Sequence, residues 1–124
     1  MKGLILILLS IMALPAIGIL TTASKPETLQ DEIKTSMVRG KTVYDLNCAS
    51  CHQTNGEGLP SVYPPLAKSD HLTKDQTKSI GILLSGQNEE ITVNGVKYNI
   101  PMSVFNHLTD EQIADVLNYI GKSW

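Results

Sequence analysis

Three segments of the chain carry apolar residues at helical spacing, and turn-forming residues separate them. The first segment runs from about Ser36 to the cysteines at positions 48 and 51, and its apolar stripe predicts a helix that leads directly into them. Glycine and proline are frequent between residues 55 and 65. Because these residues cannot continue a helix, we expect a long loop after the cysteines.

The second helix is predicted over residues 74–85. Thr73 and Gln76 have the spacing of a capping box, and Gly86 provides the end signal. Its apolar face is expected to hold Ile80, Leu83 and Leu84.

A two-stranded hairpin is predicted next, because apolar and polar residues alternate on both sides of Asn94-Gly95. Both residues of such a turn must adopt positive φ, which asparagine and glycine tolerate best. The strands would cover residues 91–93 and 96–98.

The last helix has the clearest start signal, since Thr109 and Gln112 again have capping-box spacing and acidic residues follow Thr109. We expect this helix to end at Gly121. Its apolar residues repeat at positions i, i+3, i+4 and i+7, and they are Ile113, Val116, Leu117 and Ile120. Short helices joined by loops, with one hairpin, indicate an α-rich domain.

The N-terminal region has the pattern of an export signal. Lys2 precedes an apolar run that continues to Leu20, and Ala23 is a small residue after which a signal peptide would be cut. We therefore divide the chain into a signal peptide over 1–23, a polar spacer over 24–35 and a folded domain over 36–124. An uncleaved membrane anchor is the alternative, since the apolar run is close to the length that spans a bilayer. Either interpretation exports the domain to the periplasm or another extracytoplasmic space.

The net charge and the length of the chain restrict which functions it could have. Without residues 1–23 the chain keeps nine of its ten Lys and Arg residues against twelve Asp and Glu residues, a formal charge of −3. This balance argues against nucleic acid as a partner. A domain of about a hundred residues buries barely enough apolar surface to be stable, so a cofactor in the core would stabilise it.

The candidate functional site is the C-x-x-C-H string formed by Cys48, Cys51 and His52. Two thiols one helical turn apart can each add to one vinyl group of a haem, and the adjoining histidine then reaches the iron from the same side. Other uses of a cysteine pair fit the sequence less well. A thioredoxin-like pair needs a βαβ context, a zinc site would need His71 and His107, and a disulfide would close only a small loop.

The segment from about Arg39 to Trp124 resembles the class I mono-haem cytochromes c. The resemblance rests on four pieces in order: Gly40-x-x-x-Tyr44 before the C-x-x-C-H string, then Pro64-Pro65-Leu66, then Met102, then a closing helix with Tyr119. It implies an all-α, cytochrome c-like fold of three or more short helices around one haem, with a small hairpin before the axial methionine. It also implies that the first and last helices cross closely at Gly40, Tyr44, Val116 and Tyr119.

The same resemblance implies one haem c, bound covalently through Cys48 and Cys51, with His52 and Met102 as iron ligands. Met102 is the one methionine after the C-x-x-C-H string, whereas Met37 precedes it and should lie on the wrong side of the cofactor. The alternative for Met102 is a core residue of its loop. We expect His71 and His107 to be packing or surface residues.

Two further residues are assigned by resemblance. The Pro64 carbonyl would accept the second ring N–H of His52, as ligating histidines normally require. Leu66 would supply an apolar wall of the site, together with Val62, Leu83 and Leu84. The alternative is a Pro-Pro turn followed by a leucine that belongs to the core.

These assignments predict a one-electron carrier of an exported respiratory chain rather than an enzyme. Its partners would be redox proteins, and it would act as a monomer or as a subunit of a reductase or oxidase, with membrane contact only if residues 1–23 stay attached. Three features narrow the resemblance: the Gly56-x-Gly58 loop, the string from Pro64 to Asp70, and the hairpin with Val93-Asn94-Gly95 and Tyr98-Asn99. In these features the chain looks most like the cytochrome c domains associated with copper nitrite reductases and terminal oxidases. Rival hypotheses are a haem enzyme subunit or gas sensor with a labile sixth ligand, and an interaction subunit whose haem is structural.

Overall fold

The computed structural model describes residues 28–124, except for the side chains of Thr73, Lys74 and Gln76. The predicted leader, residues 1–23, lies outside the described residues. The elements in chain order are α1 (Leu29–Asn47), α2 (Ala49–His52), α3 (Asp70–Lys74), α4 (Gln76–Ser85), β1 (Ile91–Val93), β2 (Val96–Tyr98) and α5 (Asp110–Ser123). None of the described helices is both long and apolar enough to span a membrane.

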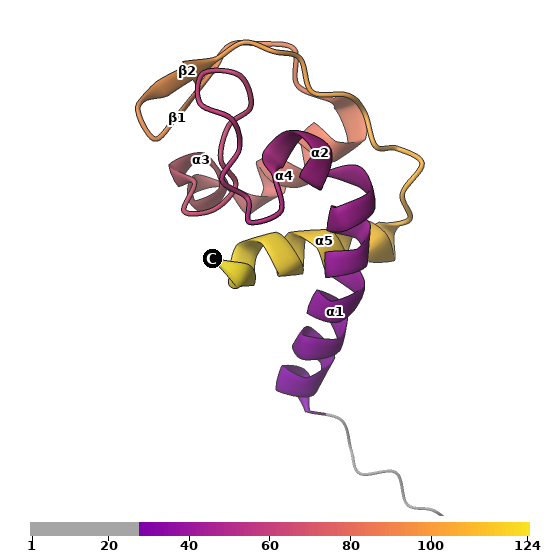
Figure 1. Ribbon diagram of the computed structural model, residues 1–124. Coiled ribbons are helices and arrows are strands. Elements are labelled where there is room, and N and C mark those ends of the chain that lie inside the picture. Colours follow the sequence, from indigo (N-terminus) through magenta and orange to yellow (C-terminus); the bar gives the residue numbers. More distant parts are fainter. Residues whose placement is uncertain (1–27) are drawn as a thin grey trace, which may run out of the picture.

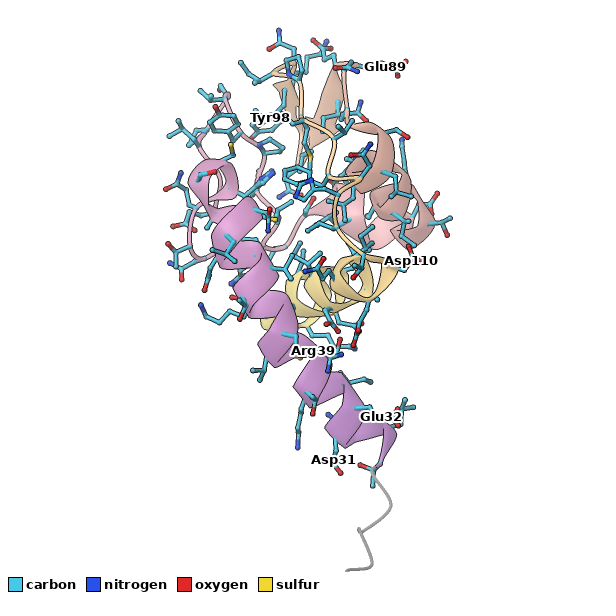
Figure 2. The ribbon with its side chains drawn as sticks, turned by 90° about the vertical axis from the view of Figure 1, so that its right-hand side faces the viewer. Asp31, Glu32, Arg39, Glu89, Tyr98 and Asp110 are labelled. Carbon is cyan, nitrogen blue, oxygen red and sulfur yellow. The ribbon has the colours of Figure 1, made fainter. Side chains whose placement is uncertain are left out.

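Helix α1 begins earlier than the sequence predicted. Thr28 caps it, because its hydroxyl oxygen accepts a hydrogen bond from the Asp31 amide at 3.2 Å, and Asp31 and Glu32 complement the helix dipole. Residues 29–35 of the expected spacer are therefore helical. This part of α1, which carries the labelled Asp31 and Glu32, projects beyond the rest of the fold (Figure 1, Figure 2). A projecting helix needs no apolar face, so the apolar pattern could not reveal it.

Helices α1 and α5 cross at close range (Figure 1). Gly40 is buried at the crossing, and a Cβ atom on it would lie 1.9 Å from the Asp115 carbonyl oxygen. Tyr44 and Val116 are inaccessible to solvent, and the ring centroids of Tyr44 and Tyr119 are 5.4 Å apart. The structure thus confirms the helix crossing that the resemblance implied.

A buried carboxylate adds polar contacts to this crossing. Asp115, only 3% exposed, accepts hydrogen bonds from Ser36 Oγ at 2.6 Å and from Arg39 Nε and Nη2 at 2.6 and 2.8 Å. Figure 2 shows the labelled Arg39 at the level where α1 passes α5. The Arg39 hydrogen bonds hold the pKa of the Asp115 carboxyl below its usual range, although burial acts in the opposite sense. Charge-assisted hydrogen bonds therefore fix α1 on α5 in addition to apolar packing.

The C-terminus extends the aromatic packing. Helix α5 has the predicted capping box of Thr109 and Gln112, but it continues to Ser123 instead of ending at Gly121. Gly121 keeps a helical conformation because a glycine within a helix is tolerated where nothing else ends it. Trp124 then packs edge-on against Tyr44, with ring centroids 5.6 Å apart.

The second predicted helix, residues 74–85, is present as α4, which begins at Gln76, and the short helix α3 that precedes it was not predicted. Thr73 lies inside α3, so the predicted capping box of Thr73 and Gln76 is wrong. Asp75 caps α4 instead, because its Oδ1 accepts hydrogen bonds from the amides of Thr77 and Lys78 at 3.0 and 3.2 Å. Of the three residues predicted for the apolar face, Leu83 is buried, whereas Ile80 and Leu84 are exposed.

The hairpin is present as predicted. Strands β1 and β2 pair antiparallel with Ile91 opposite Tyr98, and the turn residues Asn94 and Gly95 have φ of 50° and 82°. The turn is also joined to α3, because the backbone amides of Asn94 and Asp70 each donate to the other residue's side-chain oxygen, at 2.8 and 2.9 Å. The hairpin and α3 therefore form one connected unit.

Candidate haem-binding site

The two cysteines stand where α1 passes into the short helix α2. Cys48 is buried, Cys51 is half-buried, and their thiols are not bonded to each other. Both line a cavity of about 300 Å³. Burial, with a smaller contribution from Cys51, raises the pKa of the Cys48 thiol to about 11. This is the opposite of the lowered pKa that a thioredoxin-like cysteine needs, which argues against that use of the pair.

His52 lies in the same cavity with one ring nitrogen already engaged. Its Nδ1 is 2.9 Å from the Pro64 carbonyl oxygen, so the predicted contact between these two residues is present. Because a carbonyl can only accept, Nδ1 carries the proton and Nε2 keeps its lone pair for a metal. Burial lowers the pKa of His52, while the Pro64 contact raises it, and the net shift favours the neutral ring that binds metals.

The loop after His52 holds the Pro64 carbonyl in place. The Gly58 amide donates to the His52 carbonyl at 2.9 Å, and the Gly56 carbonyl accepts from the Leu66 amide at 2.8 Å. Gly58 has a φ of +66°, and a Cβ atom there would lie 2.4 Å from the Tyr63 carbonyl oxygen. This position therefore requires glycine, since a side chain would prevent the backbone at Gly58 from approaching the backbone at Tyr63 so closely.

Tyr44 supports the chain immediately after His52, a role that the sequence did not reveal. Its hydroxyl donates to the Gln53 carbonyl oxygen at 2.6 Å. Gln53 has a φ of 64°, which is unusual for a residue with a side chain. Burial raises the pKa of Tyr44, so the hydroxyl keeps the proton that it donates. Tyr44 therefore connects the crossing of α1 and α5 to the segment that carries His52, the candidate iron ligand.

Met102 lines the cavity together with His52. Its backbone pairs with Gln87 through two hydrogen bonds, in which the Met102 amide donates at 2.8 Å and the Gln87 amide donates at 3.1 Å. The Phe105 amide donates to the Leu83 carbonyl at 2.7 Å, which attaches the same loop to α4. Met37, on α1, is not among the residues that line the cavity. The structure therefore brings together all four residues that were predicted to hold the cofactor.

The walls of the cavity are mostly apolar, as a haem requires. Leu66 and Leu83 line it as predicted, whereas Val62 and Leu84 do not. Residues of α5 and of the hairpin also line it. The further apolar residues are Leu72, Ile82, Ile91, Val93, Ile100, Phe105, Leu117 and Ile120.

The two remaining histidines occupy different surroundings. His107 is exposed and packs its ring near Phe105, with centroids 5.9 Å apart, as expected of a surface residue. His71 instead lines the cavity, and its Nε2 is buried without a hydrogen-bond partner among the described residues. The sequence could not place His71 there, because helix α3 was not recognised.

The residues present fit a haem c. Two free thiols one helical turn apart, an imidazole with one available nitrogen and a thioether all line one largely apolar cavity. Within residues 28–124, no three His, Cys, Asp or Glu side chains form a group that could hold a metal ion by themselves. The zinc alternative therefore lacks ligands in the described part of the chain.

Known proteins with similar sequences are cytochromes. Cytochrome c-552 of Thermus thermophilus is 44% identical over 91 residues, covering 68% of this chain and 67% of that protein. Cytochrome c-555 of Prosthecochloris aestuarii is 32% identical over 94 residues, covering 75% of this chain and 93% of that protein. The cytochrome c subunit of the quinone alcohol dehydrogenase of Gluconobacter oxydans is 34% identical over 86 residues, and the match spans 68% of this chain but only 18% of that subunit.

The family model described as cytochrome c matches residues 37–124, which is the described structure without the first turns of α1. The match includes the cysteine pair, both candidate iron ligands and the two crossing helices. The mostly helical structure with one small two-stranded sheet agrees with it. This chain belongs to the cytochrome c family.

Proposed function

We propose that this cytochrome c carries one electron at a time on a single covalently bound haem c, with His52 and Met102 as the iron ligands. The observation that carries the proposal is that both ligand candidates line the same cavity as Cys48 and Cys51. The engaged Nδ1 of His52 adds to it, because this contact fixes the ring with Nε2 available.

When bound, the haem supplies an iron that accepts and releases one electron. The residues of the chain set how readily this happens. A methionine ligand and a largely apolar cavity would both raise the reduction potential, because they favour the less charged ferrous state. If His52 and Met102 both ligate the iron, no coordination position would be left for a substrate, and the site would transfer electrons without chemistry on a ligand.

We also propose a class of cytochrome and a cellular location for the protein. We place the protein among class I mono-haem cytochromes c, exported by residues 1–23 and working in a respiratory chain. The apolar leader pattern supports export. Support for a larger redox enzyme as partner comes from relatives that are cytochrome subunits of dehydrogenases, in addition to the sequence resemblance to domains associated with copper nitrite reductases and terminal oxidases.

A redox titration of the purified holoprotein tests this function. We expect one transition with the slope of a one-electron couple, and a reduced low-spin form whose spectrum does not change when CO is added at neutral pH. CO needs a free coordination position on the iron, and Met102 would occupy that position. Ready uptake of CO by the unmodified protein would contradict the proposal and favour a gas sensor or haem enzyme.

A further inference from the structure

Helix α3 presents a histidine to the haem cavity from a fixed position. Asp70, at the first position of α3, exchanges two backbone-to-side-chain hydrogen bonds with Asn94 in the hairpin turn, at 2.8 and 2.9 Å. Ser69, just before the helix, is 3% exposed and lines the cavity. His71 follows directly and also lines the cavity. The backbone immediately before His71 is therefore held in place by the hairpin turn.

One atom of this histidine lacks a partner. His71 Nε2 is buried, yet no hydrogen-bond partner lies near it among the described residues. A buried polar nitrogen without a partner is costly, and in native proteins such a group nearly always has one. Since the atom belongs to a cavity-lining residue, its partner is expected to enter with whatever fills the cavity.

The charges around the cavity indicate what that partner is. The described residues that line it include no lysine or arginine, and Glu89 is the one carboxylate among them. A haem is an apolar ring system except for its two propionate carboxylates, which need hydrogen-bond donors or positive charge when they are buried. His52 already donates its Nδ1 proton to the Pro64 carbonyl, so His71 is the histidine of this lining whose ring N–H is available to such a carboxylate.

We propose that His71 Nε2 donates a hydrogen bond to a propionate of the bound haem, and that this contact raises the reduction potential. The inference rests on the proposed function, because it requires a haem in the cavity. The hydrogen bond draws negative charge away from the cofactor, so its loss would favour the ferric state. His71 is then a positioning and tuning residue for the cofactor, not a ligand of the iron.

Vibrational spectra of the propionates test the contact directly. Holoprotein is made in cells fed 5-aminolevulinic acid with carbon-13 at its carboxyl carbon, which labels the haem propionates, and redox-induced infrared difference spectra are recorded. We expect His71→Phe to shift the labelled carboxylate bands and to lower the reduction potential. His71→Gln, which keeps a donor, should restore both in large part. His107→Phe makes the same change at an exposed histidine and should leave both unchanged.

The possible results separate the two proposals. A chain without added haem mass would defeat the proposed function before His71 is tested. Haem-bearing His71→Phe protein with unchanged propionate bands would overturn the inference, as would a change of iron spin state, which would make His71 a ligand. If that variant does not mature, nitrogen-15 NMR of the unmodified protein decides. The His71 ring N–H must exchange with solvent much more slowly than that of His107, and equal exchange would contradict the contact.

Discussion

Met102→Ala is expected to lower the reduction potential by on the order of 0.1 V or more, out of the roughly 0.8 V over which axial ligands set haem potentials. A thioether is a weak, neutral donor that favours ferrous iron, so its removal stabilises the ferric state. The same change should open a coordination position, and the reduced variant should bind CO where the unmodified protein does not. Spectroelectrochemistry and a CO titration measure the two effects on one sample.

Met37→Ala is the matched control. It removes the other methionine of the described chain, which lies on α1 outside the cavity lining, and it should change neither potential nor CO binding. If Met102→Ala behaves like this control, Met102 is a core residue of its loop and not the ligand. An enzymatic or sensing site would then become the better interpretation.

Gly40→Ala is expected to destabilise the folded protein by about 3 kcal/mol, the upper part of the range for overpacked cores. The added Cβ would lie 1.9 Å from the Asp115 carbonyl oxygen and 2.9 Å from Tyr119 Cβ, so α1 and α5 would have to separate. A backbone oxygen cannot move aside as a side chain can. Urea unfolding of the holoprotein gives the change in free energy, provided that the slope with denaturant stays the same.

Gly121→Ala makes the same substitution in α5, where an added Cβ meets nothing within 4 Å. There alanine should leave stability unchanged or raise it by up to about 1 kcal/mol, because glycine is the poorer helix former. Equal effects of the two substitutions would show that the close crossing at Gly40 contributes little to stability. The comparison isolates the crossing from helix propensity.

Elements with strong local signals could be predicted from the sequence. The Asn94-Gly95 turn and the capping box at Thr109 depend on residues that are neighbours in the chain, and both are present. The cavity-lining set of Cys48, Cys51, His52 and Met102 was also foreseen, because the C-x-x-C-H spacing and a family resemblance identify it. Turn and cap signals, together with the spacing of the motif residues, therefore allowed most of the fold and the site to be predicted.

Features that depend on tertiary contacts could not be predicted. The first turns of α1 have no apolar face to bury, so the apolar pattern gave no sign of them. Helix α4 begins after Asp75, but Thr73 is also a good capping residue, and the sequence alone did not decide between the two. The hydrogen bond from Tyr44 to Gln53 joins segments that only the helix crossing brings together. The position of His71 depends on the hydrogen bonds of α3 with the hairpin turn, which no local pattern encodes.

The central proposal is that the chain binds one haem covalently. The mass of the denatured holoprotein, purified from cells with a cytochrome c maturation system, tests it most directly. We expect a chain that begins at or near Ser24 and is heavier than its sequence by one haem. Neither Cys48 nor Cys51 should react with a thiol reagent, because both sulfurs would be bonded to the cofactor. A mature chain without the added mass, in which Cys48 and Cys51 form a disulfide with each other, would contradict the haem and all that depends on it.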